Sequence, residues 1–258
     1  MIKSGGYLYK MRFFRLIQLF FQKNFVFRIN FLMQWFTVVL KFSFTVLFWL
    51  SAMGASNSLS YSKMQMVIYF FVVMLRGFFV ETDITEKVST AIYQGNLSVD
   101  LLKPISYSFL NFTSYFAMKL CIVVFLVVCA IALRFFPAYS AAFAISVFFS
   151  LIINFEMSYL IGILAFWTNT VWGISMVNSV LLDVFGGRLF PIELAPSGMQ
   201  KLCTFLPYQY IFYVPLQILE RRATPLLMVG QIACAVVLFL FSRLIWQQGL
   251  KHYEATGM

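Results

Sequence analysis

Three ionisable residues lie inside long apolar runs of this chain and are the first candidates for chemistry. They are Lys41, Lys119 and Glu156. A charged side chain surrounded by lipid is costly, so such a group normally faces the interior of a helix bundle or a water-filled cavity. At 100° per residue, Lys41 shares one helix face with Gln34. We therefore predict that these four residues line a polar path or switch, with interhelical ion pairs or bonds to carbonyls as the alternative.

Motifs for catalysis are absent from the sequence. No Gly-x-x-x-x-Gly-Lys-Ser/Thr loop is present to cradle phosphates, so any ATP must bind in another chain. A single histidine, His252, and the lack of Gly-x-Ser-x-Gly or His-Glu-x-x-His argue against hydrolase chemistry. The cysteines show no metal-ligand spacing. We predict no catalytic residue, cofactor or metal site here, with a lipid-acting enzyme that uses Asp183 or Glu156 as an alternative.

The composition indicates that lipid surrounds most of these residues. The chain has 258 residues, of which 62% are hydrophobic and 11% charged, and its mean hydropathy is +0.86. Soluble domains contain about 25% charged residues, so this chain has too few charged residues to form a water-exposed surface. At roughly 20 apolar residues per transmembrane helix, the hydrophobic residues suffice for about six or seven spans. The sequence therefore predicts an all-α polytopic membrane protein.

The apolar runs place six transmembrane helices along the chain. We predict these spans at residues 29–53, 64–80, 106–133, 141–167, 171–186 and 225–246. Residues 1–28 alternate basic and aromatic side chains, which is typical of an amphipathic helix in the membrane interface. A simple cytoplasmic extension of the first span is the alternative. The six spans form one transmembrane domain that covers residues 1–258.

The basic residues indicate the orientation of the spans. The net charge is +10, and ten basic residues fall on the side of the N-terminus against six on the other side. Cytoplasmic segments carry the excess of Lys and Arg, so we predict that both termini are cytoplasmic. A nucleic-acid binder would gather its charge on a water-soluble face, which this chain lacks, so we predict no nucleic-acid partner.

Two connections between the spans stand out. Residues 81–103 form a polar cytoplasmic loop, and residues 85–94 within it are compatible with a short helix that ends at Gly95. A cytoplasmic partner could dock on such a helix. Residues 187–224 hold four of the seven prolines and are too broken to span. Irregular backbone at membrane depth is tolerated only inside protein or beside a cavity, so we predict a re-entrant outer segment, with an ordinary outer loop as the alternative.

Four groups of short motifs follow one another in a characteristic order. They are Gln94–Leu97 with Leu101–Pro104, Gly186–Gly187 with Phe190–Pro191 and Pro196, Leu206–Tyr208 with Tyr213–Leu216, and Trp246–Gly257. With these motifs set against six spans, the chain resembles a permease subunit of the ABC-2 transporter family, the six-span membrane half of a bacterial ABC exporter. The resemblance covers nearly the whole length, although no nucleotide-binding domain is fused to it.

The resemblance implies roles for the two connections. The loop after the second span would supply the coupling helix that contacts the ATPase, through Glu86, Lys87, Tyr93, Gln94 and Gly95. The segment after the fifth span would form an outer gate, through Gly186, Gly187, Phe190, Pro191 and Pro196.

The resemblance also implies partners and a location. Two copies of an ABC ATPase subunit would hold the ATP and Mg, and a second six-span permease, identical or homologous, would complete the path. The assembly would lie in the bacterial cytoplasmic (inner) membrane and export an amphipathic or hydrophobic substrate. The alternative function is a self-sufficient ion-coupled carrier or channel that uses Lys41, Lys119 and Glu156. Carriers usually show repeated halves with matching broken helices, and this chain has only one broken region.

Overall fold

The computed structural model describes residues 28–55, 62–80, 83–117, 119, 137–219 and 224–253. All regular structure in these ranges is helical, with no strand among them, which confirms the predicted all-α class. The chain divides into two compact units, Met1–Phe70 and Phe71–Met258. The interfacial helix predicted for residues 1–28 lies, apart from residue 28, outside the described residues.

The first unit contains α2 (Arg28–Ala55) and the beginning of α3 (Lys63–Val80). α2 is apolar over most of its length and holds no proline that would interrupt the helix. The hydroxyls of Thr37 and Thr45 each donate to the carbonyl four residues earlier at 2.8 Å, so they need no partner from outside the helix. Trp49 of α2 stacks on Phe70 of α3, with ring centroids 6.3 Å apart.

The second unit consists of two long helices and several short ones. The long helices are α7 (Pro137–Ile163), which continues as η1 (Leu164–Phe166), and α11 (Pro225–His252). Before α7 come α4 (Ile84–Tyr93), α5 (Leu97–Leu101) and helical residues 107–117. Between α7 and α11 come α8 (Trp172–Phe185), η2 (Ile192–Leu194), α9 (Ser197–Phe205), η3 (Pro207–Tyr210) and α10 (Tyr213–Leu219).

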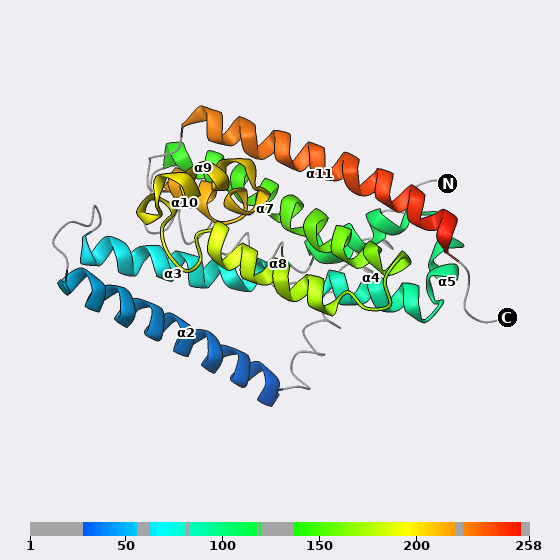
Figure 1. Cartoon of the computed structure of the whole chain (residues 1–258), viewed down its shortest axis with the longest axis horizontal. Helices are drawn as coiled ribbons and strands as arrows, with labels where there is room; N and C mark the ends of the chain where they lie inside the picture. Colours follow the sequence, from blue (N-terminus) through cyan, green and yellow to red (C-terminus); the bar gives the residue numbers. More distant parts are fainter. Residues whose placement is uncertain are drawn as a thin grey trace, which may run out of the picture. The chain divides into compact units, whose positions relative to one another are not determined.

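α7 is the central helix of the second unit. It is apolar on all sides and mostly buried, as expected for a helix that other helices surround. α11 packs along α7, α4 packs near its C-terminal end, and α10 packs near its N-terminal end (Figure 1). The two ends of α7 therefore carry different structures, with α4 at one end and the segment after α8 at the other.

The core at the C-terminal end of α7 is aromatic. Phe155 and Tyr159 of α7 are fully buried, and the ring of Tyr159 lies 5.8 Å from that of Trp246 on α11. Trp246 in turn stacks on Tyr107 at a centroid distance of 5.2 Å. The same cluster encloses Val88 of α4. Aromatic pairs contribute about 0.5–1.5 kcal/mol each beyond their burial, so this cluster holds α4, α7 and α11 together.

Three helices among the described residues are long and apolar enough to cross a membrane. Their apolar stretches are Phe36–Met53 in α2, Ala141–Phe166 in α7 and η1, and Pro225–His252 in α11. They coincide with the first, fourth and sixth predicted spans, at 29–53, 141–167 and 225–246. The chain is thus a multi-pass membrane protein.

The other three predicted spans and the orientation of the termini stay predictions. α3 occupies the second span, at 64–80, with a described apolar stretch at Lys63–Met74. Much of the third span, at 106–133, lies outside the described residues. α8 occupies the fifth span, at 171–186, but its 14 residues extend only about 21 Å. A hydrocarbon core is about 30 Å thick, so α8 is shorter than the core.

Candidate functional site

α4 has one buried face and one exposed face. Its buried residues recur at helical spacing, and its exposed residues are mostly polar or charged. The buried face consists of Ile84, Thr85, Val88, Ser89 and Ile92, and the exposed face carries Glu86, Lys87 and Tyr93. The helix predicted for residues 85–94 is thus present, and one of its faces is exposed within the part of the chain that the structure describes.

Two contacts fix the buried face of α4 to α7. The hydroxyl of Thr85 donates to the carbonyl oxygen of Ser158 at 2.9 Å. One turn further along α7, a Cβ added to Gly162 would lie 2.9 Å from the Cβ of Val88, closer than side chains normally approach. A glycine is therefore needed where the two helices meet. Because Ser158 and Gly162 are adjacent on one face of α7, α4 is attached through a strip rather than at a single point.

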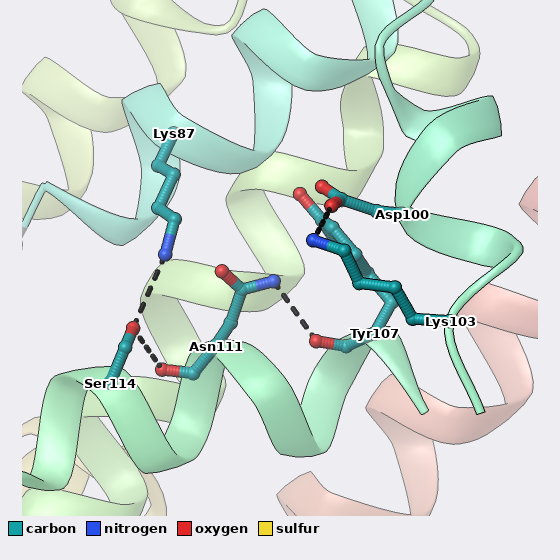
Figure 2. A network of polar contacts seen from close by, with 6 residues as sticks. All are labelled: Lys87, Asp100, Lys103, Tyr107, Asn111 and Ser114. Atoms are coloured by element: carbon teal, nitrogen blue, oxygen red, sulfur yellow. Dashed lines mark hydrogen bonds and ion pairs between the residues drawn. The ribbon is translucent and has the colours of Figure 1, made fainter. Parts of the chain in front are cut away.

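Lys87 leaves the exposed face and reaches a neighbouring helix (Figure 2). Its Nζ donates to the hydroxyl of Ser114 at 3.2 Å, and that hydroxyl lies 3.1 Å from the carbonyl oxygen of Asn111. The amide of Asn111 donates to the carbonyl oxygen of Tyr107 at 3.0 Å. The sequence grouped Lys87 with Glu86 as residues for a partner, whereas the structure also gives Lys87 a partner within the chain.

Burial and neighbouring carboxylates shift the pKa of Lys87 in opposite directions. Partial burial lowers the pKa of Lys87 below its ordinary value, and the carboxylates of Asp100 and Asp83 oppose that shift. Asp100 also pairs with Lys103 at 2.6 Å, as Figure 2 shows, and the Lys103 charge adds to the lowering of the Lys87 pKa. Lys87 is therefore a partly desolvated cation on the exposed face of α4.

A hollow of about 440 Å³ lies on the polar side of α4. It is lined by Asp83, Glu86, Lys87, Thr90, Ala91 and Asn96. Two carboxylates and one ammonium group thus line a concave surface at the end of the second unit. Such a surface offers polar and charged contacts to a protein partner, because charged groups at an interface mainly set orientation and choice of partner.

The turn after α4 is held by the last residue of the described chain. Gly95 has a φ of 72°, a conformation that glycine adopts without strain, and it follows the helix end at Gln94. The hydroxyl of Tyr253, directly after α11, donates to the carbonyl oxygen of Gly95 at 2.9 Å. The ring of Tyr253 also packs on Phe166 at 5.9 Å. The sequence interpretation gave Tyr253 no role, although it lies in the motif 246–257.

α8 ends at the two glycines that the sequence marked as a break. Gly186 caps the helix, and Gly187 has a φ of 82°. The amide of Arg188 donates to the carbonyl oxygen of Asp183 at 3.2 Å, which closes the last turn in the manner of a glycine-terminated helix. The side chains of Arg188 and Asp183 also pair at 2.8 Å. The chain then continues with Phe190, which is half-buried, and Pro191, which is buried.

Glu193 organises the segment that follows. One oxygen of its carboxylate accepts hydrogen bonds from the hydroxyl of Tyr213, at 3.0 Å, and from the amide of Gln217. The amide of Gln200 donates to the backbone carbonyls of Glu193 and Ala195 at 3.0 and 2.7 Å. Pro196, at the start of α9, is exposed. The predicted outer gate is thus built from short helices joined by polar contacts, and its re-entrant path stays a prediction.

Gln231 connects this segment to the long helices. Its amide nitrogen donates to the carbonyl oxygens of Tyr210, at 2.8 Å, and Ser146, at 3.0 Å. The Ser146 hydroxyl donates back to the Gln231 side-chain oxygen at 2.8 Å. The side chain of Gln231 is buried, so each of its polar atoms needs such a partner. This one residue, which the sequence interpretation did not single out, joins α11, α7 and η3.

The predicted path residues have different neighbours. Glu156 of α7 is buried and accepts a hydrogen bond of 2.5 Å from the hydroxyl of Ser242 on α11. The ammonium group of Lys119 lies 6.0 Å from the ring centre of Tyr115, four residues earlier in the chain. Lys41 is exposed on α2, and Gln34 lies on the same helix with its side chain outside the described part. A shared path through these four residues stays a prediction.

The fold and the site are those of a helical membrane protein. The described part contains long apolar helices, a short polar helix at one end of the central helix, and no cluster of residues that could hold a metal ion. Long apolar helices are typical of a protein embedded in lipid.

The comparison with family models identifies the family. The model described as "ABC-2 family transporter protein" matches residues 26–257, and the chain belongs to this family. It is accordingly a permease of an ABC transporter, a transport component that associates with an ABC ATPase. No curated protein and no solved structure matches the chain.

Proposed function

We propose that this chain is one membrane half of a bacterial ABC exporter and that α4 receives the movement of the ATPase. The observation that carries the proposal is the attachment of α4, which is fixed to α7 on one face and open on the other. A helix with both properties can take up a force from a partner and pass it to a membrane span. Family membership supplies the partner, an ABC ATPase.

The contacts of α4 define where such a force would go. The Thr85–Ser158 hydrogen bond and the Val88–Gly162 contact lead to α7. The turn at Gly95 leads to the end of α11 through Tyr253. α7 and α11 pack along each other, so a displaced α4 would move both long helices of the second unit. Close-packed helices transmit such shifts because their interfaces do not deform continuously.

A second permease would pair with this chain near Lys41. This lysine is exposed in the apolar stretch of α2. A charge that faces lipid at that depth is costly, so protein or water must cover it. A second six-span permease, identical or homologous, would enclose Lys41 at a shared path for an amphipathic or hydrophobic substrate, with two ATPase copies and their ATP and Mg on the cytoplasmic side.

Charge reversal at Glu86 tests the coupling role. Glu86 is exposed on α4 and lines the hollow, so Glu86→Arg leaves the buried face intact. We expect binding of the ABC ATPase to weaken on the order of tenfold, because an interface charge of the wrong sign repels its partner. Binding and transport per ATP hydrolysed are measured with permease and ATPase reconstituted together in lipid vesicles.

Lys201→Glu is the matched control, because Lys201 is an exposed charge on α9, away from α4. It should leave binding and transport unchanged. Wild-type binding and transport by Glu86→Arg would remove α4 from the proposed contact with the ATPase. Transport by the wild-type chain alone, at a rate that ATP and the ATPase do not change, would instead support the ion-coupled carrier.

A further inference from the structure

A second hollow lies at the C-terminal end of α11, against η1. Its volume is about 350 Å³, and it is lined by Leu164, Trp167, Ile245, Gln248, Lys251 and His252. It shares no lining residue with the hollow on α4. Nothing in the proposed coupling mechanism uses it.

The hollow lies where two apolar helices end. The apolar stretch of α7 and η1 ends at Phe166, one residue before Trp167, and that of α11 ends at His252. Both ends meet at this hollow, which places it at the boundary between lipid and water. Tryptophan is enriched at that depth because its ring is apolar and its N–H is polar.

The lining changes from apolar to cationic along α11. Ile245 and, on η1, Leu164 are half-buried apolar residues, whereas Gln248, Lys251 and His252 follow one to two turns nearer the helix end. The ring of His252 is held by two contacts: Nδ1 lies 3.1 Å from the carbonyl oxygen of Gln248, and the ring centroid lies 5.8 Å from that of Trp167.

The charge of the hollow selects its ligand. Lys251 brings a positive charge, Gln248 brings an amide, and no carboxylate is among the lining residues. The C-terminal end of a helix repels anions, so an anion here would be bound by side chains rather than by the backbone. A phosphate attached to apolar chains fits both halves of the lining. Basic pockets between membrane helices bind anionic lipid headgroups in this way.

We propose that this hollow binds the headgroup of an anionic phospholipid, with the phosphate at Lys251 and His252 and an acyl chain along Leu164 and Ile245. The site requires only that the end of α11 lies at a membrane surface. It is therefore independent of the ATPase contact at α4, and either proposal can fail without the other.

Native mass spectrometry of the full chain tests the site. The chain is released from detergent micelles that contain equal amounts of phosphatidylglycerol and phosphatidylcholine, and the retained lipids are counted. We expect the wild type to retain phosphatidylglycerol in preference to phosphatidylcholine. Lys251→Gln should lower that preference about fivefold, as expected for the loss of one cation next to an anionic headgroup. Lys251→Arg should keep it.

The control and the contrary outcomes separate lipid from other ligands. Lys201→Gln removes another exposed lysine, on α9, and should leave the preference unchanged. Equal retention of the two lipids by the wild type, or an unchanged preference in Lys251→Gln, would overturn the proposal. Displacement of the lipid by millimolar glycerol phosphate would also overturn it, because the hollow would then recognise free phosphate without acyl chains.

Discussion

At the scale of single residues, the carboxyl group of Glu156 depends on one serine. Glu156 is 3% exposed within the apolar stretch of α7, and the structure gives it the hydroxyl of Ser242 at 2.5 Å. We expect Ser242→Ala to destabilise the chain by about 1–3 kcal/mol, since a buried acceptor would lose its donor. Thermal unfolding of the purified chain in detergent measures the loss.

Two further variants separate this structural role from ion coupling. Ser179→Ala is the control, because the exposed Ser179 hydroxyl donates only to the carbonyl four residues earlier. Glu156→Gln keeps an acceptor for Ser242 and should unfold at a temperature closer to that of the wild type than Ser242→Ala does. Loss of transport in Glu156→Gln without loss of stability would contradict a purely structural role and favour the carrier.

At the scale of elements, the packing of α4 on α7 depends on one glycine, Gly162. Gly162→Ala would bring a methyl group within 2.9 Å of Val88 Cβ and 3.2 Å of the Thr85 carbonyl oxygen. Overpacking of this kind costs about 1–3 kcal/mol, which outweighs the gain of up to about 1 kcal/mol from replacing a helical glycine. We therefore expect faster amide hydrogen exchange in Ile84–Tyr93, measured by mass spectrometry.

Gly173→Ala provides the matched comparison on α8. A Cβ at Gly173 meets no atom within 4 Å, so only the gain in helix propensity remains. Exchange in Ile84–Tyr93 should then equal that of the wild type. If Gly162→Ala also left this exchange unchanged, the helices would have room to separate without loosening α4, and the strip that joins α4 to α7 would not be rigid.

At the scale of the whole molecule, a hydrogen bond joins residues 158 positions apart in the second unit, Tyr253 and Gly95. Tyr253→Phe keeps the ring on Phe166 but removes the hydroxyl that holds the turn after α4. We expect a cost of about 0.5–1.5 kcal/mol and less transport per ATP hydrolysed, because α11 would no longer follow α4. Reconstituted vesicles with the ATPase provide the measurement.

Tyr210→Phe is the comparison at the other end of α7. The Tyr210 hydroxyl lies 3.5 Å from the carbonyl oxygen of Thr204, at the limit of a hydrogen bond, so its removal should change little. ATPase binding should be the same in both variants, because neither hydroxyl lines the hollow on α4. A Tyr253→Phe variant that transports as efficiently as Tyr210→Phe would mean that α11 does not depend on this contact.

The sequence by itself determined where three long helices lie and where two helices end. Long apolar runs specify membrane helices through composition alone, which is why α2, α7 and α11 fall on predicted spans. Glycine specifies helix ends through its own backbone freedom, and Gly95 and Gly187 both have a positive φ where the sequence indicated an end. These properties depend on a residue and its near neighbours, so they can be predicted from a single sequence.

Only the tertiary structure decided which side chains meet. Lys87 and Ser114 are 27 positions apart, Glu156 and Ser242 are 86 apart, and Gly95 and Tyr253 are 158 apart. No local pattern relates such pairs, because their distance depends on how whole helices pack. For the same reason the sequence could single out Lys87 and Glu156 by their charge but could not assign their partners. The amphipathic helix at residues 84–93 was predictable, whereas its attachment to α7 through Gly162 was not.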